Sequence, residues 1–220
     1  MNRIKTTIAE GGVLVNPSFE EGWHEQGASQ LVIPDGWTVE YWEGGNPWFR
    51  PEIKPNEEFA TNGKFSIRAF APEHSRTRFG IWQEVPATPG QWYKFSADVR
   101  LESKPDGRLA GYVGIQPWGD SVFKRQMVWG KETQEQVEWT RVEVIAQAFG
   151  GKIRVALGAT NDYATRNNTT WWDNAKLELW ECSTEPEPPD PPDPPVPGDP
   201  VDYARIENIV ADRPPVRWPR

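Results

Sequence analysis

The sequence predicts an all-β protein built as a sandwich of two antiparallel sheets. Alternation of apolar and polar residues is its dominant pattern, and turn residues interrupt the alternation at short intervals. About eleven short strands can be drawn in this way, whereas no segment of useful length has the period of a helix. Two packed antiparallel sheets are the natural way to bury so many short strands.

Each predicted strand is an alternating run bounded by turn residues. Asn62-Gly63 is a tight-turn signal before the strand at 65–70, and the prolines and glycine at 86–90 end the strand at 79–85. The longest alternation, from Tyr93 to Leu101, predicts a central strand. In order, the predicted strands are 13–16, 37–43, 48–53, 65–70, 79–85, 93–101, 109–116, 122–129, 138–146, 152–158 and 171–180.

The C-terminal part of the chain has a different composition. Residues 184–200 read T-E-P-E-P-P-D-P-P-D-P-P-V-P-G-D-P, which predicts a polyproline II spacer of roughly 50 Å. We therefore expect an N-terminal arm at 1–11, one β-sandwich domain at 12–182 and a Pro-rich linker at 183–200. The remaining segment, 201–220, is either the start of a truncated domain or a docking peptide. Its apolar anchors for a partner would be Ile206, Ile209, Val210 and Trp218.

Charge and hydropathy exclude several classes of partner. Residues 181–220 hold nine acidic and four basic side chains, which is −5 of the net charge of −8 and leaves −3 for the body. Such a body has no electrostatic reason to bind nucleic acid or an anionic membrane. No run approaches the roughly 20 apolar residues of a membrane span. No signal peptide is visible in the first residues, and the single cysteine, Cys182, cannot form an internal disulfide.

Tryptophan is unusually abundant, with 13 residues in 220. Its large flat side chain serves either packing or the stacking of flat ligands such as sugar rings. Four tryptophans lie in predicted strands and are expected in the core or on a sheet face: Trp37, Trp92, Trp139 and Trp180. Three lie beside Gly or Pro in predicted loops, where we expect ligand contacts: Trp23, Trp48 and Trp118.

Five motifs occur in a characteristic order. They are V-L-V-N-P-S-F-E-E-G at 13–22, P-D-G-W at 34–37, N-G-K-F-S-I-R-A at 62–69, the strand pair at 81–100, and W-W-D-N-A-K-L-E-L at 171–179. This ordered set resembles the jelly-roll carbohydrate-binding modules of families 4, 9, 16 and 22 over residues 12–180. The resemblance implies a jelly-roll fold and a non-catalytic role, attaching a larger protein or particle to a glycan surface.

The resemblance also implies a structural calcium ion between the first loop and the last strand. Its ligands would be Glu20, the carbonyl oxygen of Lys64 and Asp173, with Glu21 as a substitute ligand. Calcium takes six to eight oxygen ligands, which carboxylates and loop carbonyls supply. The alternative is that Glu20 and Asp173 are solvated acids at strand ends.

A sugar site needs an aromatic platform flanked by planar hydrogen-bonding side chains. By resemblance, the site would lie on the concave sheet face or in the loops at one end. Gly111 and Gly114 leave room for a ligand beside their neighbours on the strand at 109–116. The predicted binding residues are Trp42, Trp48, Tyr112, Gln116, Trp118 and Trp129, and the alternative for each is ordinary sheet packing.

Catalysis has little support in the sequence. The chain lacks the G-x-S-x-G elbow, the phosphate-binding loop, the Rossmann glycines and a zinc ligand set. Besides a carbohydrate-binding module, the alternative is a structural or decoration subunit of a viral or extracellular assembly whose Pro-rich tail docks on a partner. Both functions predict a location outside the cell or on a virion or cell surface.

Overall fold

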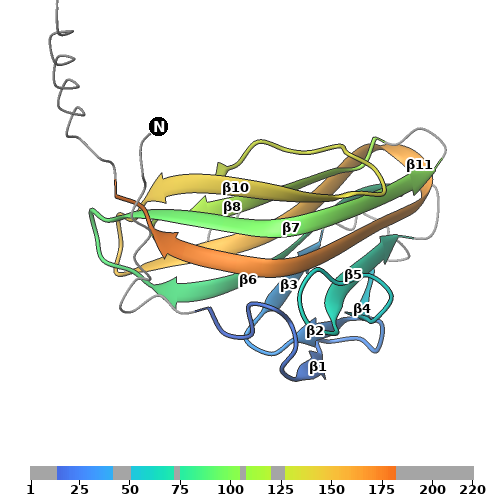
Figure 1. The fold of residues 1–220 in the computed structure, drawn as a ribbon, viewed down its shortest axis with the longest axis horizontal. Coiled ribbons are helices and arrows are strands. Elements are labelled where there is room, and N and C mark those ends of the chain that lie inside the picture. The colour runs from blue at the N-terminus through green and yellow to red at the C-terminus, as the bar shows by residue number, and fades with distance from the viewer. Residues whose placement is uncertain (1–13, 42–50, 72–74, 105–107, 120–126, 182–220) are drawn as a thin grey trace, which may run out of the picture. The chain divides into compact units, whose positions relative to one another are not determined.

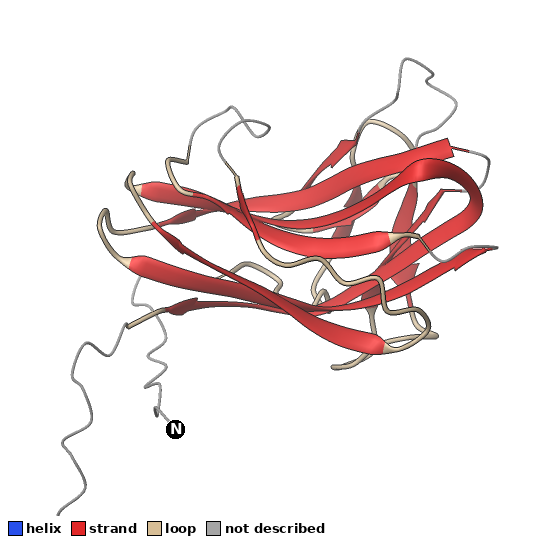
Figure 2. Ribbon diagram, turned by 90° about the horizontal axis from the view of Figure 1, so that it is seen from above, coloured by secondary structure: helices blue, strands red, loops and turns tan. Residues whose placement is uncertain are grey.

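The computed structural model describes residues 14–41, 51–71, 75–104, 108–119 and 127–181. The chain divides into two units, Met1–Ser183 and Thr184–Arg220, and the second lies outside the described residues. Figure 2 shows only strands and loops in the described part. That part therefore contains no helix with the length and hydropathy of a membrane span.

Eleven strands make up the described fold, which confirms the predicted all-β class (Figure 1). Their bounds are β1 Trp23–Glu25, β2 Val32–Pro34, β3 Thr38–Tyr41, β4 Glu52–Asn56, β5 Ser66–Ala71, β6 Ser75–Pro86, β7 Trp92–Lys104, β8 Ala110–Gln116, β9 Val128–Trp129, β10 Trp139–Gln147 and β11 Lys152–Leu179.

The strands form two antiparallel layers that share one strand. The first sheet has the order β10-β7-β11-β5-β4, and the second has the order β9-β8-β11-β6-β3. Strands β1 and β2 form a separate two-stranded sheet. The arrangement is the predicted jelly-roll β-sandwich, and β11 is the central strand of both layers.

Strand β11 passes from one layer to the other. Residues Lys152–Thr160 pair with β6 and β8 in the second sheet, and residues Thr169–Leu179 pair mainly with β7 and β5 in the first. The pairing register shifts between Asn161 and Thr169, where the strand turns from one layer to the other. In Figure 1, β11 bends around one end of the sandwich. The predicted strands 152–158 and 171–180 are therefore two arms of one continuous strand.

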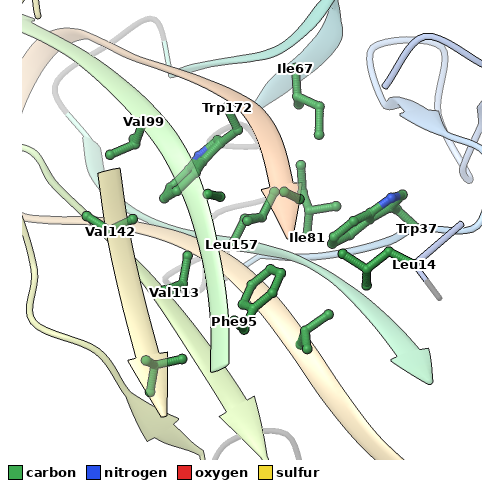
Figure 3. Close-up of a cluster of buried hydrophobic side chains, with 14 of the residues drawn as sticks. Leu14, Trp37, Ile67, Ile81, Phe95, Val99, Val113, Val142, Leu157 and Trp172 are labelled. Atoms are coloured by element: carbon green, nitrogen blue, oxygen red, sulfur yellow. The ribbon is translucent and has the colours of Figure 1, made fainter. Parts of the chain in front are cut away.

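The core fills the space between the two layers. Phe95, Val99 and Trp172 come from the first sheet, and Ile81 and Leu157 come from the second; all are buried. Figure 3 shows these side chains directed toward one another between the strands. Alternation along each strand places every second side chain in this core, and the remaining side chains form the outer faces.

The opening motif folds as a loop, so the predicted strand at 13–16 is wrong over its described residues. Asn16 and Phe19 have positive φ angles of 48° and 61°, which are incompatible with an extended strand. The Asn16 side chain accepts the Glu21 N–H at 2.9 Å, and the Trp37 Nε1–H donates to the Val15 carbonyl at 3.1 Å. This loop covers one side of the core with Phe19, whose ring meets Trp37 edge-on at 5.6 Å.

Candidate functional site

The outer face of the second sheet carries three of the residues predicted from the β8 segment and its neighbour. Val113 and Ile115 of β8 point into the core. Because side chains alternate along a strand, Tyr112 and Gln116 lie on the opposite, outer face. Trp129 of β9 pairs with Gly114 of β8 and joins the same face.

Small residues form the centre of this face. In β11, Gly158 lies opposite Tyr112 and Ala156 lies opposite Gly114. In β6, Gly80 and Trp82 lie opposite the same two positions of β11. We call Gly80, Gly114, Ala156 and Gly158 the small-residue floor. All four are buried, so larger side chains lie over them.

Tyr112 and Trp129 lie over this floor as a contacting aromatic pair. Their ring centroids are 4.8 Å apart and their planes meet at 83°, an edge-to-face geometry. A Cβ built on Gly158 would lie 2.6 Å from Cε2 of Tyr112, and one built on Gly114 would lie 2.4 Å from Cε3 of Trp129. The rings therefore occupy the space that glycine leaves. Trp129 is 44% exposed, so this pair offers an aromatic surface to a ligand.

A charged group borders the same face. The Arg154 guanidinium lies 4.4 Å from the centre of the Trp82 ring, and its Nε and Nη2 are each 3.3 Å from Oε2 of Glu84. Lys152 Nζ lies 2.6 Å from the other Glu84 oxygen. The hydrogen bond from Lys152 and then that from Arg154 outweigh burial and hold the pKa of Glu84 below its ordinary value. Glu84 is thus an ionised acceptor at neutral pH.

Gln116 connects this face to the next loop. It is fully buried, and its Oε1 accepts the backbone N–H of Trp118 at 3.1 Å. Trp118 itself lies beyond the end of β8, where its ring packs against Phe149 at 4.8 Å and stays 44% exposed. The structure therefore brings Tyr112, Gln116 and Trp129 together and places Trp118 in a separate aromatic pair.

Four residues of this region are not among the predicted binding residues. They are Trp82, Glu84, Arg154 and Phe149. The signal for Trp82 and Glu84 was present, because both alternate with the buried Ile81 and Val85 of β6. No comparable signal marked Phe149, whose partner is distant in sequence. The predicted Trp42 and Trp48 lie outside the described residues.

Two of the predicted calcium ligands, Glu20 and Asp173, contact the same turn, 61–65, through its backbone N–H groups. Glu20 Oε1 accepts the N–H groups of Lys64 and Phe65 at 2.9 and 2.7 Å. Asp173 Oδ2 accepts the N–H groups of Thr61 and Asn62 at 2.6 and 2.9 Å. Burial raises the pKa of Asp173 above its ordinary value against the opposing effect of these donors. The two carboxylates thus hold the two ends of a single turn.

The donor set at this turn bears on the predicted ion. No group of three or more His, Cys, Asp or Glu side chains that could hold a metal occurs among the described residues. Calcium at this turn would therefore depend on Glu20, Asp173 and backbone carbonyl oxygens such as that of Lys64, which is an oxygen set that calcium accepts. Glu21 is exposed and its backbone N–H is held by Asn16. The calcium ion stays a prediction.

The predicted docking anchors lie outside the described residues. They are Ile206, Ile209, Val210 and Trp218. Their role in binding a partner stays a prediction.

Comparison with solved structures addresses the fold. TmCBM61, solved in complex with beta-1,4-galactotriose, aligns with a TM-score of 0.51 and 18% identity over 76% of this chain and 97% of that chain. This chain has the fold of the carbohydrate-binding modules. The CBM22-1 xylan-binding domain of Paenibacillus barcinonensis Xyn10C aligns with a TM-score of 0.49 and 20% identity, over 80% and 99% of the two chains.

A third solved structure is the Family 16 Carbohydrate Binding Module-2, with a TM-score of 0.45 and 21% identity over 74% and 97% of the two chains. No protein-family model and no curated protein sequence matches this chain. At such identities a common fold does not determine a common ligand, which depends on the side chains of the site.

Proposed function

We propose that this chain is a non-catalytic carbohydrate-binding module whose glycan site is the outer face of the second sheet. The observation that carries the proposal is the Tyr112–Trp129 pair, set on glycines that leave room for the two rings. The apolar CH faces of sugar rings stack on aromatic rings, and such contacts are a common use of exposed Trp and Tyr. Such a module tethers a larger protein or particle to a glycan surface outside the cell or on a virion or cell surface.

Polar side chains beside the aromatic pair suit the hydroxyl groups of a sugar. Glu84 is an ionised acceptor, and Arg154 is a planar group that donates in fixed directions, while the buried Gln116 supports the face from below. Arg154 is held in place by both Trp82 and Glu84. A side chain fixed in advance loses less entropy when a ligand binds, which favours affinity.

Calcium is part of the proposal as a structural ion at the turn 61–65. Glu20 and Asp173 support it, because both carboxylates already converge on that turn from the first loop and the last strand. The ion would fix the turn to the second arm of β11, which carries Asp173. It lies outside the proposed glycan site, so it would act on stability.

The test is glycan binding by the wild-type protein and by Trp129→Ala and Tyr112→Ala variants. Beta-1,4-linked galactan and xylan oligosaccharides are suitable probes, and titration calorimetry gives the dissociation constants. Each variant should weaken binding about fivefold or more, since a stacked aromatic contributes on the order of 1 kcal/mol. Trp92→Ala is the matched control, because Trp92 is 41% exposed but belongs to the first sheet.

Two results would refute the proposal. One is a wild-type protein that binds no glycan on an array containing these probes. The other is that the Trp129→Ala variant and the Tyr112→Ala variant both bind glycan as tightly as the Trp92→Ala variant. Thermal melting of each variant shows whether a loss of binding reflects unfolding.

A further inference from the structure

A second aromatic pair lies at one end of the sandwich. Trp118 follows β8, and Phe149 lies in the loop between β10 and β11. Their ring centroids are 4.8 Å apart and their planes are tilted by 40°. Trp118 is 44% and Phe149 is 52% exposed, so neither ring belongs to the core. Two large rings that contact each other while facing solvent are unusual for a surface that serves only solubility.

The two loops are tied together by backbone hydrogen bonds. The N–H groups of Phe149 and Gly150 donate to the Pro117 carbonyl at 2.8 and 3.2 Å. A Cβ on Gly150 would lie 2.6 Å from the Trp118 carbonyl oxygen, so this close approach requires glycine. The loop before β11 is fixed further by the Ala148 N–H, which donates to the Gln91 carbonyl at 2.8 Å. Both rings therefore extend from loops whose backbones are fixed by hydrogen bonds.

The second pair is continuous with the proposed glycan site. Gln116, on the outer face of the second sheet, accepts the Trp118 N–H and sets the position of its backbone. Gly119 packs against Lys152, whose ammonium group binds Glu84 on the same face. Trp118 follows Gly114, which lies beneath Trp129, by four residues, and the last two of these lie beyond the end of β8. Polar side chains thus occupy the interval between two aromatic platforms.

Resting on the proposed function, we propose that Trp118 and Phe149 form a second sugar subsite on the same glycan chain that contacts Tyr112 and Trp129. The ligand is then an extended glycan, bound across several sugar units, and a single terminal sugar would engage one platform only. The polar side chains between the platforms favour a continuous hydroxylated ligand over an apolar one. Two anchors on one chain also raise affinity through effective concentration.

The test measures affinity against ligand length. Wild type, Trp118→Ala, Phe149→Ala and Trp129→Ala are titrated with beta-1,4-linked galacto- and xylo-oligosaccharides of increasing length. Wild-type affinity should rise with length. Trp118→Ala and Phe149→Ala should each bind the long oligosaccharides about fivefold more weakly and bind the short ones as wild type does. Trp129→Ala should weaken binding at every length, and Trp92→Ala should change nothing.

The outcomes separate this inference from the proposed function. If both variants bind the long oligosaccharides as tightly as wild type while Trp129→Ala loses affinity, the second subsite is refuted and the proposed function stands. Equal losses on short and long ligands would place Trp118 within one common site and would also refute a second subsite. A wild-type protein that binds none of the oligosaccharides refutes both. Because both side chains are exposed, thermal melting should show folded variants.

Discussion

Replacing Gly158 with Ala tests whether the position of Tyr112 matters, without removing any side chain of the proposed site. The added Cβ would lie 2.6 Å from Cε2 of Tyr112. Optimal carbon–carbon contact is about 3.5–4.0 Å, so the ring must move by about 1 Å. Tyr112 is partly exposed and can move outward, away from its contact with Trp129.

Two opposing effects decide the stability of Gly158→Ala. Loss of the edge-to-face contact removes about 0.5–1.5 kcal/mol. Alanine in place of glycine restricts the unfolded chain and adds about 0.4–1 kcal/mol at a position where its backbone fits. These contributions nearly cancel, so we expect the free energy of unfolding to change by less than about 1 kcal/mol. Glycan affinity has no such compensation and should fall about fivefold.

The assay pairs urea denaturation with calorimetric titration of glycan. Gly151→Ala is the matched control, because a Cβ at Gly151 meets nothing within 4 Å. It should leave binding unchanged. The reasoning is refuted if Gly158→Ala binds glycan as tightly as Gly151→Ala, or if it destabilises the fold by more than about 3 kcal/mol, the upper end of overpacking effects.

Three further predictions concern stability. Chelator should lower the melting temperature, since a free calcium concentration of 100 times the dissociation constant stabilises the folded state by about 2.7 kcal/mol. Asp173→Ala should abolish the effect of the chelator. If the chelator leaves the melting curve of wild type unchanged, the predicted calcium site is refuted. Because the pKa of Glu84 is lowered in the folded state, Glu84 contributes to the free energy of unfolding at neutral pH. This contribution is lost as the pH falls below 4.5, the ordinary pKa of the group. Lys152→Ala should therefore reduce the dependence of the melting temperature on pH in that acid range. The difference in the free energy of unfolding should stay below about 1 kcal/mol, because Lys152 is exposed. Parallel curves of melting temperature against pH for wild type and variant would contradict this. Phe95→Ala empties a fully buried site and should cost about 3–5 kcal/mol in urea denaturation, whereas a loss below 1 kcal/mol would mean that the core repacks.

Alternation was sufficient to predict the sandwich, whereas Tyr112 and Gln116 were predicted from the family resemblance and from the neighbouring glycines. In the structure, alternation along β8 places Tyr112 on the face opposite the buried Val113 and Ile115, and Gln116 shares the face of Tyr112 but is itself fully buried. Alternation failed at the opening motif, where Asn16 and Phe19 adopt positive φ and the chain loops. Side-chain bonds of Asn16 stabilise that loop, and periodicity does not detect them.

Contacts between segments that are distant in sequence could not be predicted from the pattern of residues. Trp118 and Trp129 are both aromatic and lie near the same strand, yet Trp118 pairs with Phe149 and Trp129 with Tyr112. Which rings pair depends on which loops meet at the end of the sandwich. Contacts between loops produce no periodic pattern in the sequence. Trp92 was expected in the core or on a sheet face, and it lies on a sheet with 41% of its surface exposed.

The shared strand β11 has a consequence for how the chain folds. It is the last of the described strands in sequence and the central one in both layers, so β5, β6, β7 and β8 each keep one unpaired edge until it arrives. During synthesis from the N-terminus, the earlier strands must wait with unpaired edges until residue 179 has emerged. Such late, long-range pairing gives a high contact order and a slow closing step. Substitutions in the second half of β11 should therefore slow folding more than equally destabilising ones in β3 or β4, which lie at the outer margins of the two layers.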